Sequence, residues 1–184
     1  MSVGKYSLSL LCGYDSMLVL LDDLWERDGK RSDDLAIMLG GMNRTVSGPP
    51  LDAAQWSDWL DATLFVRPDF ESVRRAREQI QSDHTAFLKT LEIQDFETQC
   101  SAIRLLQEAA SQRSWHVAGN EQMDLLQAYA AVVAFLRAYW KRRNSASNDI
   151  FQILQQFESG QPALWESWVS AVAEQSKIER DNSR

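Results

Sequence analysis

Residue types that catalyse reactions or bind metals are scarce in this chain, which has two histidines and two cysteines among 184 residues. Neither His84 nor His116 belongs to the H-x-x-x-H or H-E-x-x-H patterns that place zinc ligands on one helix face. Cys12 and Cys100 have no cysteine at metal-binding spacing, so we interpret them as free thiols in a reducing compartment. Gly40-Gly41 lacks the Lys-Ser/Thr of a phosphate-binding loop. The sequence therefore predicts no catalytic centre, no metal site and no cofactor.

Turn-forming residues and long apolar runs are also scarce. Eight glycines and four prolines favour long helices over many short strands. No run approaches the roughly 18 uncharged apolar residues of a membrane helix, and the apolar run in residues 1–13 is too short for a signal peptide. We therefore expect a cytoplasmic protein. The net charge of −7 argues against nucleic acid or an anionic membrane as the main partner and is compatible with a basic protein.

The chain aligns with itself when it is shifted by 115 residues. Residues 8–39 then match residues 123–154 without a gap and with nine identities. A shift of 109 residues aligns Trp56 and Trp59 with Trp165 and Trp168. Both segments carry the apolar i, i+3, i+4, i+7 stripe of an amphipathic helix. We predict an all-α protein with two degenerate three-helix repeats, residues 8–66 and 120–173, joined by two connecting helices in residues 67–119 and followed by a polar tail in residues 174–184.

Positions that match in both repeats are candidates for the shared fold. Ser32 and Ser147 are predicted to cap the second helix of each repeat, since a serine before an apolar run accepts a hydrogen bond from the first helical turn. Trp25 and Trp140 are predicted to be largely buried at equivalent positions, because the core is favoured over an interface for such large aromatic side chains.

Charge, in contrast, differs between the repeats. Residues 14–66 contain ten acidic and four basic residues, whereas residues 129–173 contain three acidic and four basic ones. A carboxylate pair such as Asp22 and Glu26 could bind a divalent ion, but acidic residues on one helix face are usually a solvated surface. Because the acidic residues are missing from the second repeat, we expect that folding does not require them.

Two segments, SDDLAIML at residues 32–39 and DAAQWSDWLDA at residues 52–62, resemble small bacterial proteins encoded beside polymorphic or contact-dependent toxins. Such neighbours are commonly immunity proteins. The resemblance implies a protein that binds a cognate toxin domain and blocks its active site or its substrate entry. Immunity proteins are often acidic against basic nuclease toxins. The alternative interpretation is a helical scaffold or self-assembling subunit, and the neighbouring gene would discriminate between the two.

The candidate partner-binding site is an acidic face formed by the first and third helices of the first repeat. Its partner would be a basic protein domain, which such a field attracts over long distances. The first helix would contribute three residues at spacings of seven and four, so that they share a face opposite the apolar stripe. The predicted site residues are Asp15, Asp22, Asp23, Glu26, Asp58 and Asp61.

Overall fold

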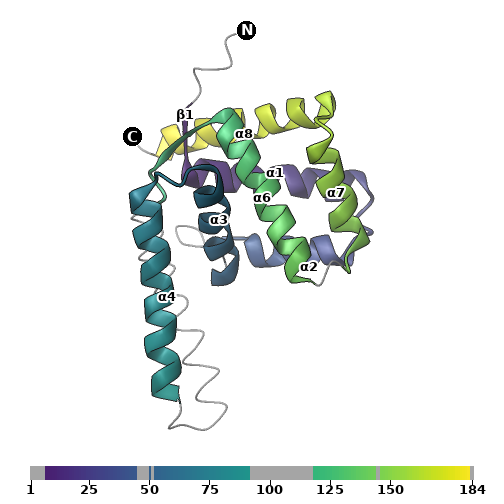
Figure 1. The fold of residues 1–184 in the computed structure, drawn as a ribbon. Helices are drawn as coiled ribbons and strands as arrows, with labels where there is room; N and C mark the ends of the chain where they lie inside the picture. The colour runs from purple at the N-terminus through teal and green to yellow at the C-terminus, as the bar shows by residue number, and fades with distance from the viewer. Residues whose placement is uncertain (1–6, 45–49, 51, 92–117, 144–145, 183–184) are drawn as a thin grey trace.

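The computed structural model describes residues 7–44, 50, 52–91, 118–143 and 146–182, which form helices and two short strands (Figure 1). The predicted all-α class is confirmed, and none of the helices described is long and apolar enough to cross a membrane. His116 and Cys100 lie outside the described residues. In chain order the elements are β1 (Ser7–Ser9), α1 (Leu10–Arg27), α2 (Asp33–Met42), α3 (Ala53–Val66), α4 (Glu71–Leu91), β2 (Gln122–Asp124), α6 (Leu125–Arg142), α7 (Asn148–Glu158) and α8 (Pro162–Asn182).

Side-chain caps fix where the helices begin. The Ser32 hydroxyl accepts a hydrogen bond from the backbone N–H of Leu35, and Ser147 accepts one from Ile150, which confirms both predicted caps. At the other end of α1, Gly29 adopts a φ of 71°, the left-handed conformation in which a helix commonly ends. Serine caps and a glycine in the left-handed conformation therefore determine the helix boundaries in this region.

Two three-residue strands, which the sequence analysis did not predict, lead into α1 and α6. They pair antiparallel, with Leu8 opposite Met123, two residues that are 115 positions apart. The flanking pairs are Ser7 with Asp124 and Ser9 with Gln122. Ser7 aligns with Gln122 and Ser9 aligns with Asp124 at the 115-residue shift, so the pairing is symmetric between the two segments. This ribbon therefore brings the starts of α1 and α6 side by side (Figure 1).

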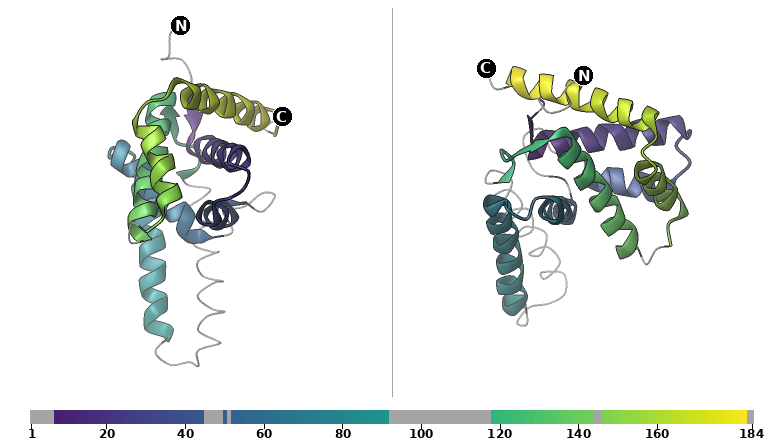
Figure 2. Two further views of the ribbon diagram at one scale, coloured as in Figure 1. Left: turned by 90° about the vertical axis from the view of Figure 1, so that its right-hand side faces the viewer. Right: turned by 45° about the horizontal axis from the view of Figure 1, so that its top comes forward.

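The third helix of each segment packs mainly on the first helix of the other segment. Helix α3 lies along α6, and α8 lies along α1 (Figure 2). The two helices of each pair run antiparallel. Arg67, at the end of α3, donates to Gln127 at the start of α6 at 3.0 Å, and Arg27, at the end of α1, donates to Ser167 near the start of α8 at 3.1 Å. The residues of both segments therefore contribute to one core.

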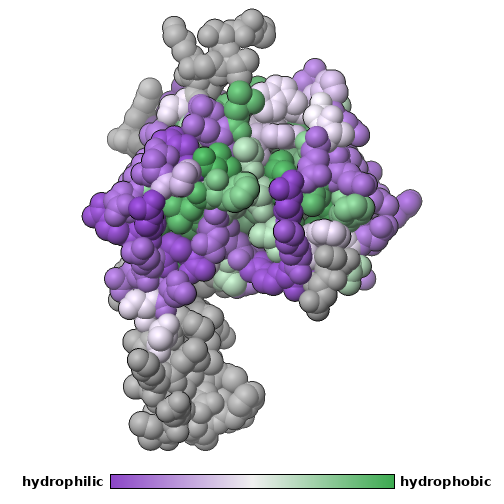
Figure 3. All heavy atoms as spheres, in the orientation of Figure 1, coloured by the Kyte–Doolittle hydropathy of each residue, from purple (hydrophilic) through white to green (hydrophobic). Residues whose placement is uncertain are grey.

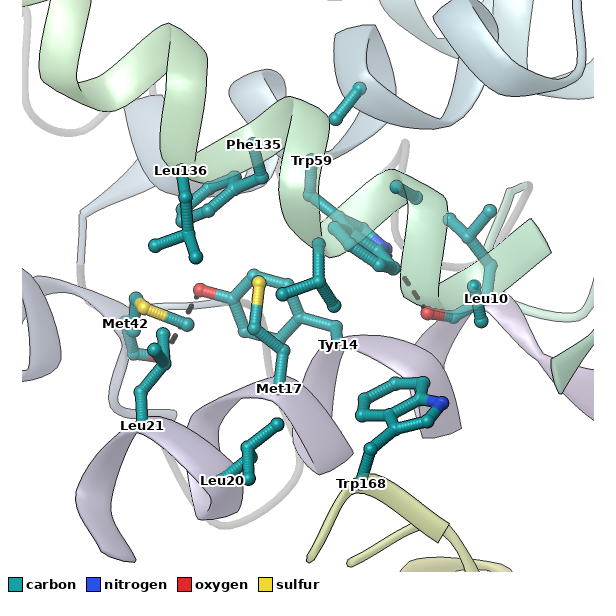
Figure 4. Packing of buried hydrophobic residues seen from close by; sticks show 14 of the residues in the cluster. Leu10, Tyr14, Met17, Leu20, Leu21, Met42, Trp59, Phe135, Leu136 and Trp168 are labelled. Atoms are coloured by element: carbon teal, nitrogen blue, oxygen red, sulfur yellow. Dashed lines mark hydrogen bonds between the residues drawn. The ribbon is translucent and has the colours of Figure 1, made fainter. Parts of the chain in front are cut away.

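Tryptophan side chains join these helix pairs to the rest of the core. The indole N–H of Trp59 donates to the carbonyl of Leu10 at 3.1 Å, and that of Trp168 donates to the carbonyl of Leu125 at 3.3 Å. Both rings are fully buried, and Figure 4 shows them on either side of Tyr14. Each hydrogen bond satisfies a polar group that would be costly to bury alone.

One expectation from the sequence is wrong and another is confirmed. Residues 174–182 are not a tail, because α8 continues through them to Asn182 and packs on α1, where the Ser176 hydroxyl lies 3.4 Å from the Cys12 thiol. Trp25 and Trp140 both pack against the core with their indole nitrogens buried, which agrees with the expected burial at equivalent positions. Both lie in the last turns of their helices, at the edge of the core, which explains their partial exposure.

Candidate protein-binding surface

The six predicted site residues do not share one exposed face. Three of them, Asp22, Asp23 and Glu26, are exposed near the C-terminal end of α1. Cations from the same stretch of chain accompany them, because Lys30 pairs with Glu26 and Arg27 lies 3.9 Å from Asp23. Exposed i, i+4 pairs of this kind contribute only a few tenths of a kcal/mol to stability. These carboxylates therefore remain accessible to a partner at little cost to the fold.

Asp15 lies apart from them, half-buried in an ion pair with Arg44. The pair lines a cavity of about 200 Å³ between α1 and α8, next to Cys12. Burial raises the pKa of Asp15, and the Arg44 guanidinium opposes that rise. Burial also raises the pKa of the Cys12 thiol, which disfavours the reactive thiolate. The prediction that Asp15 belongs to the exposed acidic face of α1 is therefore wrong.

Asp58 and Asp61 contact other helices rather than extending the surface of α1. Asp58 is half-buried and pairs with Arg142 of α6, whereas Asp61 accepts a hydrogen bond from Arg77 of α4 at 2.6 Å. Burial raises the pKa of Asp58, while the hydrogen bond and charge of Arg142 oppose the rise. The expectation of a joint acidic face on α1 and α3 fails because α3 packs mainly on α6.

The basic end of α6 makes a second cross-helix pair. Arg143, directly after α6, donates to Asp34 of α2 at 2.8 Å. Hydrogen bonds from Ser147 and from Arg143 lower the pKa of Asp34. Together with the Asp58–Arg142 pair, this contact uses acidic residues to hold α6 against the first segment. A structural role is expected for Asp34, which matches Asp149 in the other repeat, whereas the contact of Asp58 with α6 is not expected from its alignment with Ser167. Sequence reasoning missed the pairing of Asp58 with Arg142, although the opposite net charges of the two segments were a signal for it.

Five exposed acidic residues gather where α1 ends and α2 begins. We call this region the acidic corner. The residues aligned with it at the 115-residue shift are neutral or basic, namely Arg137, Ala138, Lys141, Arg143 and Asn148. The acidic corner comprises Asp22, Asp23, Glu26, Asp28 and Asp33, all of which are exposed.

An apolar surface lies elsewhere, over α3 and α6, where apolar side chains gather near the centre of the face shown in Figure 3. The two most exposed large apolar side chains on these helices are Phe65, at 75%, and Leu126, at 58%. At the position that corresponds to Leu126 by the 115-residue shift, Leu11 is half-buried and lines the α1–α8 cavity together with Ile178. Helix α8 thus covers Leu11, whereas α3 ends too early to cover Leu126.

Neither a cluster of metal ligands within the described residues nor a similar protein identifies a function for these surfaces. Within the described residues, no group of three or more His, Cys, Asp or Glu side chains is placed to hold a metal ion. The side chain of His84 is not among those described. No protein-family model, no curated protein and no solved structure matches the chain. The arrangement of surface residues is therefore the basis for any functional conclusion.

Proposed function

We propose that the protein is a non-catalytic immunity protein that binds a basic toxin domain through the acidic corner. The observation that carries this proposal is the exposed cluster of carboxylates at the end of α1, which contrasts with basic residues at matching positions of α6. Asp22 corresponds to Arg137 and Glu26 to Lys141. Both carboxylates are exposed, so a cationic surface can approach them without displacing any part of the core.

The fold itself is proposed to be an internal duplication, with two degenerate three-helix repeats and the first repeat specialised for binding. Hydrogen bonds that recur at the 115-residue shift support this proposal. The Tyr14 hydroxyl donates to the carbonyl of Met42 at 3.3 Å, and the Tyr129 hydroxyl donates to that of Phe157 at 3.2 Å. A duplication explains why acidic residues could change in one repeat while the shared packing was kept.

An acidic surface of this kind acts mainly on the rate of association. Complementary charges steer a basic domain toward the surface and raise the association rate, and salt weakens that effect. Close-packed contacts at the centre of the interface then set the dissociation rate. Bound in this way, the protein blocks the active site or substrate entry of the toxin without any chemistry of its own.

The proposal is tested with the toxin domain encoded by the adjacent gene. Cells expressing that domain should stop growing, and co-expression of this protein should restore growth. Calorimetry with a catalytically inactive toxin domain should show a one-to-one complex. An adjacent gene that encodes no toxic domain, or a toxic domain that this protein neither binds nor neutralises, contradicts the proposal.

Self-assembly is the second candidate function, and the apolar surface on α3 and α6 favours it. Phe65 corresponds to Glu174 in the other segment, at the 109-residue shift. Replacing Phe65 with glutamate should convert an oligomer into a monomer if the apolar surface is an interface between copies. Light scattering of the purified wild type decides the matter, because a monomer at high concentration excludes this function.

A further inference from the structure

The solvent-facing side of α2 differs in character from that of α7. Ile37 of α2 is 59% exposed, and Gly40 follows it one turn later, also exposed. The corresponding residues of α7 are Gln152 and Gln155, both exposed and polar, as is usual for a helix face in water. The first segment therefore presents an aliphatic side chain and a bare backbone where the second presents two amides.

Gly40 has no evident role in the fold. A methyl group added to it would meet nothing within 4 Å, and its backbone is helical, without the positive φ that would require glycine. Gly41 differs, because its added methyl group would lie 3.2 Å from the Cβ of Asp52. Glycine inside a helix is less stable than alanine. Packing within the chain therefore does not explain why a destabilising glycine occupies position 40, and contact with a partner would explain it.

We propose that Ile37 and Gly40 form the apolar centre of the surface that binds the basic toxin domain, with the acidic corner as its charged rim. Ile37 inserts into an apolar pocket of the partner, and Gly40 lets the partner backbone approach α2 closely. The inference rests on the proposed function and identifies the residues that hold the complex together.

The acidic corner is what selects a basic partner for this apolar centre. Asp33 precedes Ile37 by four residues, so it lies on the same face of α2, about 6 Å along the helix axis. It is exposed, and Asp28 is exposed in the preceding turn. An apolar centre inside a charged rim is the usual anatomy of a specific protein interface, in which a few central side chains contribute most of the binding energy.

The experiment compares substitutions in α2 with matched substitutions in α7. Ile37→Gln and Gly40→Gln introduce the residues that α7 carries, and Gln152→Ala and Gln155→Ala are the controls. The probe is the inactive toxin domain of the adjacent gene. Both α2 variants should raise the dissociation constant at least tenfold, mainly through faster dissociation, and neither α7 variant should change it. Gly40→Ala should raise the melting temperature while also weakening binding, which separates binding from folding.

Each other outcome overturns the inference in a recognisable way. If the wild type does not bind the toxin domain, the proposed function fails and the inference fails with it. If the wild type binds and reversal of Asp22 and Glu26 slows binding, but the α2 variants bind normally, only the inference fails. A lower melting temperature for Gly40→Ala would give Gly40 a structural role instead. Dimers of the wild type that Ile37→Gln dissociates would show that a second copy covers this face.

Discussion

The C-terminal ends of α1 and α6 differ in charge although the two helices match in length and in their buried residues. Both span 18 residues and bury aliphatic or aromatic side chains at corresponding positions, such as Leu20 and Phe135. Asp22 and Glu26 of α1 align with Arg137 and Lys141 of α6 at the 115-residue shift. The difference shows that packing constrains the inner side of these helices and leaves their outer ends free to carry different charges.

Helices α3 and α8 differ in length, and that difference changes what each one covers. Arg67 and Pro68 follow α3, and a proline restricts the residue before it to extended conformations, so the helix ends at Val66. Helix α8 meets no proline and continues to Asn182. The additional turns of α8 therefore give Leu11 a partial cover that Leu126 lacks.

Removing a central tryptophan from either segment is expected to have the largest effect. Trp59→Ala and Trp168→Ala each delete a fully buried ring and its hydrogen bond to a helix carbonyl. Each should lower the free energy of unfolding by about 3–5 kcal/mol, as for other large-to-small core substitutions. Urea unfolding measures both. A cost below about 1 kcal/mol at one site would break the equivalence of the two segments, since core substitutions of this size cost more than that.

Removing the tyrosine hydroxyls should have a smaller effect than removing the tryptophans in both segments. Tyr14→Phe and Tyr129→Phe each leave the acceptor carbonyl, Met42 or Phe157, without its hydroxyl donor. We expect a loss of about 1 kcal/mol for each, and the larger loss at Tyr14, which is more deeply buried. Thermal unfolding monitored by circular dichroism provides the comparison. A larger loss at Tyr129 would contradict the ranking by burial.

Asp34 and Asp58, which pair with arginines at the end of α6, should change the pH dependence of stability in opposite directions. These effects should be smaller than those of the tryptophan and tyrosine substitutions. The raised pKa of Asp58 means that its charge opposes folding at neutral pH, a penalty removed as the pH falls through the folded-state pKa. The lowered pKa of Asp34 means a contribution present above its unfolded pKa and lost as the pH falls through the folded-state pKa.

Unfolding of the wild type and of two variants between pH 7 and pH 3 tests this contrast. Relative to Asp58→Asn, the wild type should gain stability on acidification. Relative to Asp34→Asn, it should lose stability over the same range. Parallel pH profiles for the two variants would mean that Asp34 and Asp58 occupy equivalent electrostatic environments.

The sequence predicts the helices well because their signals are local. Ser32 and Ser147 cap helices where serine precedes an apolar run, and Gly29 ends α1 in the left-handed conformation. The polar composition of residues 174–182 concealed the end of α8, since only contacts with α1 reveal that this stretch is helical and packed. The three-residue strands are too short for an alternating pattern to be visible.

The candidate site was less predictable because it depends on which helices are neighbours. An apolar stripe indicates that one side of α3 is buried, but it does not say that α6 covers it. For that reason the sequence predicts a surface position for Asp58, whereas Arg142 of α6 pairs with it in the structure. Asp22, Asp23 and Glu26 are exposed as expected, whereas Asp15, which shares a face with Asp22 and Glu26 by spacing, is covered by Arg44 and α8.

The association rate with the toxin domain, measured after a charge exchange between the two segments, tests the central claim most directly. One variant carries Asp22→Arg and Glu26→Lys, and the matched control carries Arg137→Asp and Lys141→Glu. At low salt the first variant should associate at least tenfold more slowly than the wild type, while the control should associate at least as fast and both remain folded. Equal rates for the wild type and the first variant would contradict binding through the acidic corner.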